Sequence, residues 1–200
     1  MKKLTFSFLF LFFVSFSFGQ SFMHGAGVGI FGLKNAGSDF TVASSLSYNP
    51  RITFVEGENF SVSAGLPIDI GFSGNYSAEY NSRYGGYEEN TLQFFVSAPA
   101  MVNLNFGAGS TPDNESRIGF FIGAGYGLRY GKYGTTISDP NYYDDLISYK
   151  YKAGFGPAGN AGARFAVGSN QKNIEVRLSY MKVHGNESPN VYGVNCYFNF

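Results

Sequence analysis

Apolar and polar residues alternate along most of this 200-residue chain. In the C-terminal segment 191–200 the even positions are apolar and most odd positions are small or polar. Successive side chains of a β-strand point to opposite faces, so this period of two predicts a strand with one apolar and one polar face. The clearest example is the segment 60–72, where every second residue from Phe60 to Phe72 is apolar.

The same alternation predicts about eight strands. They span residues 22–31, 40–54, 60–72, 91–106, 118–130, 148–167, 174–183 and 191–200. The connections 56–59, 109–117 and 168–173 are short, whereas 73–90 and 131–147 are long and polar. Short periplasmic turns and longer extracellular loops are typical of outer-membrane barrels. We therefore predict an all-β fold, an eight-stranded antiparallel up-and-down transmembrane β-barrel.

The first 19 residues have the features of a secretory signal peptide. Two lysines precede an apolar run from Leu4 to Phe18, and small residues at positions 17 and 19 suit signal peptidase. We predict cleavage after Gly19, which leaves residues 20–200 as one barrel domain in the cell outer membrane. No later stretch is long and apolar enough to form a membrane-spanning helix.

Composition excludes several other classes of protein. The chain has 14 Lys+Arg and 14 Asp+Glu, and without the two signal-peptide lysines the count is 12 against 14. Such a chain has no basic excess that would attract nucleic acid. The 27 glycines, the aromatic content of 18% and the charged content of 14% suit tightly packed strands rather than a disordered chain. Cys196 is the single cysteine, so an intrachain disulfide is excluded.

The polar face of the strands indicates which side meets lipid. A soluble barrel with an apolar interior, such as a lipocalin, would need a charged exterior. Here the polar face consists mostly of Gly, Ser, Asn and Thr, which suit a narrow lumen better than a water-exposed surface. The charged residues within the strands share this face, apart from Lys182 and His24 at predicted strand ends, where water is near. A Lys or Arg facing lipid at mid-bilayer would cost about 2–4 kcal/mol.

Two groups of charged residues are therefore predicted to point into the lumen. The periplasmic group is Arg51, Arg164, Glu175 and Arg177, and the outer group is Asp69, Arg129, Lys150 and Lys152. Charges in a confined lumen are tolerated when they are paired. We expect Glu175 to lie between the guanidinium groups of its neighbours and Asp69 to be the acid nearest to the outer basic residues. The alternative is that each charge contacts lumenal water.

The chain resembles the small outer-membrane β-barrels of the OmpA/OmpX type, in the form found in Bacteroidetes. The resemblance covers the whole mature chain and rests on the alternation, the loop asymmetry, the terminal Phe200 and the Gly19-Gln20 junction. It implies that the last strand carries the signal read by the barrel-assembly machinery. The residues of this assembly signal are Tyr192, Val194, Phe198 and Phe200. No catalytic motif comes with the resemblance.

The remaining motifs favour no enzyme, metal or cofactor. Residues 27–32 match G-x-G-x-x-G, but neither the helix nor the acidic residue of a dinucleotide site follows. The aspartates between positions 139 and 145 do not have the spacing of a calcium loop. His24 and His184 fall at opposite rims of the predicted barrel, so neither can assist the other in nucleophilic catalysis.

These observations predict a non-enzymatic outer-membrane protein that acts through its extracellular loops or in membrane integrity. The first long loop carries four tyrosines that we expect to be displayed on the cell surface, Tyr76, Tyr80, Tyr84 and Tyr87. The alternatives are a small pore or an accessory of a secretion system, and a lipid-modifying enzyme. We expect a monomer that contacts outer-membrane lipids and the assembly machinery, with an extracellular partner that the sequence does not identify.

Overall fold

The structure is a computed structural model that describes residues 21–34, 40–81, 85–137, 146–168, 172–184 and 189–200. The predicted signal peptide and its cleavage site lie outside the described residues. Within them, no helix is long and apolar enough to cross a membrane.

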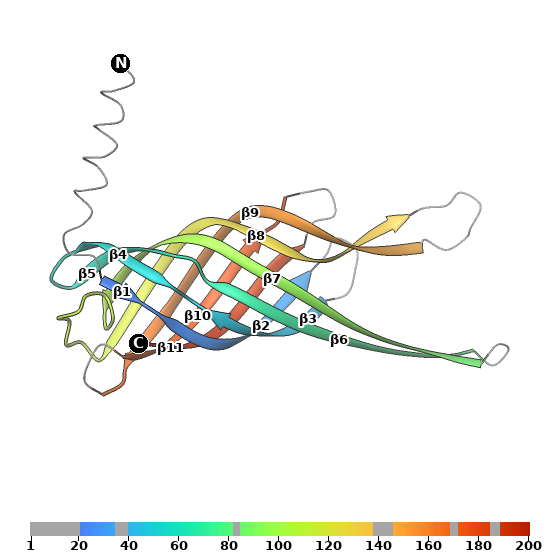
Figure 1. Cartoon of the computed structure of the whole chain (residues 1–200), viewed down its shortest axis with the longest axis horizontal. Coiled ribbons are helices and arrows are strands. Elements are labelled where there is room, and N and C mark those ends of the chain that lie inside the picture. Colours follow the sequence, from blue (N-terminus) through green and yellow to red (C-terminus); the bar gives the residue numbers. More distant parts are fainter. Residues whose placement is uncertain (1–20, 35–39, 82–84, 138–145, 169–171, 185–188) are drawn as a thin grey trace, which may run out of the picture.

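Eleven β-segments make up the described part of the chain (Figure 1). They are β1 (Ser21–Met23), β2 (Gly25–Lys34), β3 (Phe40–Tyr48), β4 (Arg51–Glu56), β5 (Phe60–Gly65), β6 (Ile68–Asn81), β7 (Gly85–Gly107), β8 (Ile118–Ile137), β9 (Leu146–Ala166), β10 (Asn173–Lys182) and β11 (Asn190–Asn199). Short interruptions divide three strands into the pairs β1–β2, β3–β4 and β5–β6, so these segments form eight barrel strands.

Two of the interruptions coincide with prolines. Pro50 separates β3 from β4, and Pro67 separates β5 from β6. A proline has no backbone N–H to donate to the ladder, so regular pairing breaks at these positions. The two breaks lie side by side, because the backbone N–H of Leu66 donates to the carbonyl of Pro50 at 3.1 Å. This hydrogen bond keeps the two strands together at the interruptions, and β3–β4 and β5–β6 each continue as one barrel strand.

Each barrel strand pairs antiparallel with the strands next to it in the sequence, and the last strand pairs with the first. At this seam β11 lies beside β2, with Cys196 opposite Val28. The pairing of β7 with β8 from Val96 to Gly107 completes the ring. The predicted fold class, an eight-stranded antiparallel up-and-down barrel, is confirmed.

Burial alternates along the strands as the sequence pattern predicts. In β11 the side chains alternate between buried and exposed along almost the whole strand. The outward face is apolar, with Leu46 66% exposed and Phe120 62% exposed. The four residues of the predicted assembly signal lie on this outward face, namely Tyr192, Val194, Phe198 and Phe200. The inward face carries mainly small, polar and charged residues.

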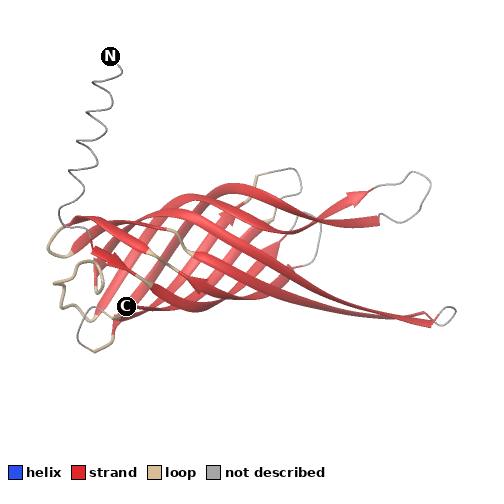
Figure 2. Cartoon of the chain, viewed as in Figure 1, coloured by secondary structure: helices blue, strands red, loops and turns tan. Residues whose placement is uncertain are grey.

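Two predicted loops are largely β-structure. The predicted loop 73–90 contains the end of β6 and the start of β7, and the predicted loop 131–147 contains the end of β8 and the start of β9. These segments pair with each other, for example Ser77 with Glu89 and Thr135 with Ser148. The sequence analysis missed them because a ribbon outside the barrel needs no apolar face to keep its backbone ladder. Figure 2 shows both hairpins extending well beyond the barrel.

The C-terminal residue is held at the barrel seam, at the end opposite to the long hairpins (Figure 1). His24 and Phe200 exchange two backbone hydrogen bonds, with N···O distances of 3.0 and 2.8 Å. Their rings stack with centroids 5.8 Å apart. Phe200 therefore extends the last strand pair of the closing seam by one residue.

Deletion of Phe200 is expected to reduce the amount of folded barrel in outer-membrane fractions, because it removes the terminal aromatic ring and the last hydrogen-bonded pair of the seam. The shift between folded and unfolded bands on unheated gels measures this amount. Phe106→Ala is the control, since Phe106 is also an exposed aromatic at this end of the barrel. Equal folded fractions in the deletion variant and the wild type would contradict the proposed role of the terminus.

Candidate functional site

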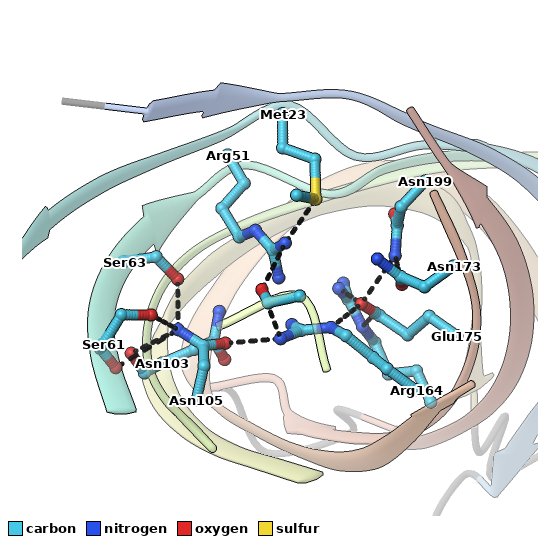
Figure 3. Close-up of polar contacts among 12 residues, drawn as sticks. Met23, Arg51, Ser61, Ser63, Asn103, Asn105, Arg164, Asn173, Glu175 and Asn199 are labelled. Atoms are coloured by element: carbon cyan, nitrogen blue, oxygen red, sulfur yellow. Dashed lines mark hydrogen bonds and ion pairs between the residues drawn. The ribbon is translucent and has the colours of Figure 1, made fainter. Parts of the chain in front are cut away.

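The barrel interior holds six of the eight charged residues that the sequence predicts to be lumenal, namely Arg51, Asp69, Arg129, Arg164, Glu175 and Arg177. The best-defined group is centred on Glu175, whose carboxylate is buried between two guanidinium groups. Figure 3 shows one of them, that of Arg164, beside Glu175. Arg164 Nε donates to Glu175 Oε2 at 2.7 Å, and Arg177 Nε donates to Oε1 at 2.9 Å. Asn199 Nδ2 also donates to Oε2, at 3.2 Å. Glu175 is 0% exposed, so these contacts compensate a fully buried charge.

Strand register brings this group together. Glu175 on β10 lies directly opposite Arg164 on β9, and Arg177 follows two residues later on the same face of β10. Both guanidinium groups also contact the ring of Phe121, with the carbon Cζ 4.4 Å from the ring centroid for Arg164 and 5.4 Å for Arg177. The aromatic face stabilises the positive charge that a single carboxylate does not neutralise.

Arg51 points into the same interior but contacts other groups. Its Nη2 donates to the sulfur of Met23 and, at 3.3 Å, to the carbonyl of Gly109. Arg164 Nη1 also reaches this carbonyl, at 3.5 Å. The turn after β7 is thus drawn toward the barrel mouth and held there by two arginines. Gly109 has φ of 66°, a left-handed conformation that glycine adopts without strain.

The sequence analysis placed all four charges in one cluster around Glu175. The structure brings Arg164 and Arg177 into contact with the carboxylate, whereas Arg51 interacts with Met23 and the turn. In the structure, two arginines therefore contact one acid, and the guanidinium group of Arg51 donates to neutral acceptors instead.

Asn105 extends this polar group to the opposite wall. Its Oδ1 accepts a hydrogen bond from Arg164 Nη1 at 2.9 Å, and its Nδ2 donates to the hydroxyl of Ser63 at 3.0 Å and to that of Ser61 at 3.2 Å. The sequence analysis did not select these residues. The available signal was the recurrence of Asn on the inward face, at positions 103, 105, 195 and 199.

Two residues of the predicted outer cluster, Asp69 and Arg129, are buried in the interior. Asp69 is buried and accepts hydrogen bonds from Ser47 Oγ at 2.6 Å and from Asn195 Nδ2 at 3.0 Å. The Arg129 guanidinium stacks on Phe95, with Cζ 4.0 Å from the ring centroid.

Lys152 was predicted to be lumenal, but it is exposed. It pairs with Gly131 on the protruding part of the β8–β9 hairpin, beyond the last pairing of β9 with β10. A side chain on the inward-facing side of β9 therefore points to solvent at this position, because the barrel wall has already ended. The side chain of Lys150 lies outside the described residues.

An apolar plug fills the interior toward the long hairpins. It consists of the buried residues Phe31, Ala43, Phe95, Met181, Val183 and Val191. Glycines on neighbouring strands make room for the rings. A methyl group at Gly71 would lie 2.0 Å from the Phe95 ring, and one at Gly193 would lie 2.6 Å from Phe31. The sequence analysis missed this plug because it described the inward face only by its small, polar and charged residues.

A cavity of about 30 Å³ lies between the apolar plug and the charged group. Asp69, Asn160, Arg177 and Asn195 are among its lining residues. This volume has room for roughly one or two water molecules. In the described interior, charged, polar and apolar side chains thus follow one another along the barrel, and the cavity between the plug and the charged group has room only for one or two waters.

The surface tyrosines were predicted to share one displayed loop. Tyr84 lies outside the described residues, as do the side chains of the other three. The backbone places Tyr76 opposite Asn90, Tyr80 opposite Gly86, and Tyr87 opposite Glu79 on the protruding β6–β7 hairpin. The described part of the chain brings together no group of three or more His, Cys, Asp or Glu residues that could hold a metal ion.

No protein-family model and no curated protein sequence matches this chain. Solved structures do share its fold. The attachment invasion locus protein Ail of Yersinia pestis matches with 12% identity and a TM-score of 0.50, over 91% of this chain and 99% of that chain. Neisserial surface protein A matches with 12% identity and a TM-score of 0.52, over 90% of this chain and 97% of that chain.

Ail in complex with the heparin analogue sucrose octasulfate matches with 13% identity and a TM-score of 0.51, over 91% of this chain and 99% of that chain. At these identities the likeness establishes the fold, which is that of small outer-membrane barrels. It does not transfer a ligand or an activity.

Glu175→Gln is expected to lower the free energy of unfolding by about 3–5 kcal/mol, since it leaves the charges of Arg164 and Arg177 buried without a carboxylate. Urea titration of the barrel in phospholipid vesicles measures the change. Glu58→Gln is the matched control, because Glu58 is exposed in the turn between β4 and β5 and should change stability by less than about 0.5 kcal/mol. Equal stabilities of the two variants would show that the ion pairs contribute nothing.

Proposed function

We propose that this protein is a non-enzymatic integral outer-membrane barrel that binds a partner outside the cell through its two protruding hairpins. In this proposal the β6–β7 and β8–β9 hairpins lie outside the cell, and the C-terminus faces the periplasm. The observation that carries the proposal is a filled barrel from which two β-ribbons extend.

The outer surface of the barrel supports a membrane location. It is apolar around the strands, and exposed tyrosines gather near the long hairpins. Four of these are Tyr126, Tyr130, Tyr180 and Tyr192. Several of the aromatic rings contact one another, for example Phe94 and Tyr151 with centroids 5.5 Å apart. A belt of aromatic residues is typical of the boundary between lipid and water in outer-membrane barrels.

The interior argues against a constitutive pore, the first alternative. An eight-stranded barrel is just wide enough to be filled by its own side chains. Here the filling includes the plug around Phe95 and the ion pairs around Glu175, with a cavity of about 30 Å³ between them. A hydrated solute has no continuous path through such packing.

A lipid-modifying enzyme, the second alternative, would need a nucleophile with a base in reach. His24 Nδ1 contacts the hydroxyl of Tyr48 at 2.6 Å, at the C-terminal end of the barrel. His184 lies near Tyr126, with ring centroids 6.1 Å apart, at the end with the long hairpins. The two imidazoles are therefore on opposite rims, and the described contacts assemble no catalytic triad.

The protruding hairpins offer backbone edges for binding. The pairing of β3 with β6 stops at Phe72, whereas β6 continues to Asn81. The pairing of β8 with β7 stops at Tyr130, whereas β8 continues to Ile137. In the described residues, these extensions pair only within their own hairpin. An extended peptide can add a strand to such an edge, with the backbone providing affinity and the side chains providing specificity.

Planar-bilayer recordings should show no stable single-channel conductance for the purified wild-type protein. The expectation follows from the filled interior, because hydrated ions cannot cross the apolar plug. Phe95→Ala combined with Met181→Ala is the informative variant, since both side chains belong to the plug. Steady conductance of the wild-type barrel would favour the pore alternative and contradict the proposal.

Shortening the β6–β7 hairpin is expected to abolish peptide binding while the barrel remains folded. Ser73 and Gln93 are paired, so residues 74–92 can be replaced by an Asn-Gly turn that joins them. Panning of a random-peptide phage library on the wild type should enrich strand-forming peptides that the shortened variant does not retain. Equal enrichment on both proteins would contradict binding at these edges.

The orientation requires its own control. A tag inserted between Gly85 and Gly86, at the start of β7, should be labelled by an antibody on intact cells. Labelling only after lysis would place the hairpin in the periplasm and reject the proposed surface role.

A further inference from the structure

Two lysines interrupt the apolar outward face at the rim that carries the long hairpins. Lys34 is the last residue of β2, and Lys182 is the last residue of β10. Asn190 on the intervening β11 lies opposite both of them. The two Cα atoms are thus separated by two strand spacings, or about 10 Å. Both lysine side chains are exposed, so their ammonium groups can approach one ligand from either side of β11.

An apolar groove of about 590 Å³ begins two residues below this row. Its rim on these strands is formed by Gly32, Tyr180 and Tyr192, which are opposite one another in register. Further down, the lining includes Ile30, Val42, Ala161, Leu178 and Val194. The rings of Tyr180 and Tyr192 lie 5.3 Å apart and form a raised wall, whereas Gly32 and Ala161 keep the surface low.

The charges and the groove are matched to one kind of ligand. None of the outward residues in the top three rows of β2, β11 and β10 is acidic, so the charge that these described rows carry where the groove begins is positive. The hydroxyl of Tyr180 donates to Asn190 Oδ1 at 2.9 Å. This bond uses the oxygen of the Asn190 amide, so its NH₂ group can serve as the donor to a ligand. An anionic head group fits these donors, and a hydrocarbon chain fits the groove.

We propose that Lys34, Lys182 and the groove beneath them bind one phosphorylated lipid of the outer leaflet. Its phosphate lies between the two ammonium groups and accepts a hydrogen bond from Asn190. One of its acyl chains lies along the wall of Tyr180 and Tyr192. The inference rests on the orientation proposed above, in which this rim lies in the outer leaflet, but it does not depend on peptide binding by the hairpins.

Native mass spectrometry of the intact barrel released from mixed micelles tests the site. The micelles contain either bisphosphorylated lipid A or its dephosphorylated form. The wild type should retain one molecule of the phosphorylated lipid. The Lys34→Gln/Lys182→Gln variant should retain it about thirtyfold more weakly, since each of the two interfacial lysines contributes about 1 kcal/mol toward an anionic head group. Retention should also fall in Ala161→Phe, which fills the groove.

Two matched variants control for general effects. Lys172→Gln removes an exposed lysine from the opposite rim, and Ala64→Phe enlarges an exposed outward residue on β5, away from the groove. Both should retain the lipid as the wild type does, and folding of every variant is checked by its gel shift.

Equal retention by the double lysine variant and the wild type would overturn the proposal, as would equal retention of the two lipid forms by the wild type. Lipid retention with no peptide enrichment would reject only the function of the hairpins. If the tag at Gly85 is labelled only after lysis, the rim faces the inner leaflet and the assignment to an outer-leaflet lipid is wrong.

Discussion

The closed backbone ladder is the constraint on which the rest of this structure depends. Lipid offers no hydrogen-bond partner, so a sheet that spans a membrane must pair every strand edge. Here the pairing of β11 with β2 meets that requirement. With eight strands the ring is narrow, and its interior has to be filled by side chains that satisfy one another. The ion pairs of Glu175 and the packing of Phe95 against Gly71 are two ways in which side chains fill this narrow interior.

The interior combines interactions that are usually found in separate places. Near the C-terminus, Arg164 and Arg177 hold a buried carboxylate, and Asn105 links Arg164 to the opposite wall. Toward the hairpins, Phe31 and Phe95 pack edge to face, with centroids 5.2 Å apart. The polar part fixes which strand lies next to which, since an acid and its arginines must match in register. The apolar part excludes water from the other end.

The strands could be predicted from the sequence because their alternation reflects two environments, lipid outside and a filled lumen inside. The pairing of Glu175 with Arg164 could be predicted as well, since both are inward on adjacent strands near the same end. The plug around Phe95 could not be predicted. When an inward aromatic residue stands next to an outward one, the alternation of apolar and polar residues does not show which of the two faces the lumen. Whether Lys152 faces the lumen or solvent depends on where the barrel wall ends. The alternating pattern does not indicate this point, because the strand continues into the hairpin.

The outward residues of this barrel are under a much weaker constraint than the inward ones. Every apolar side chain of suitable size can replace another on a surface that contacts fluid hydrocarbon, whereas Gly71, Glu175 and Asn105 each fit particular neighbours. Most outward positions therefore tolerate exchange of one apolar residue for another, whereas the inward positions do not. Such a division is compatible with barrels that share a fold at 12% identity. Relatives of such proteins are better sought by comparing every second residue.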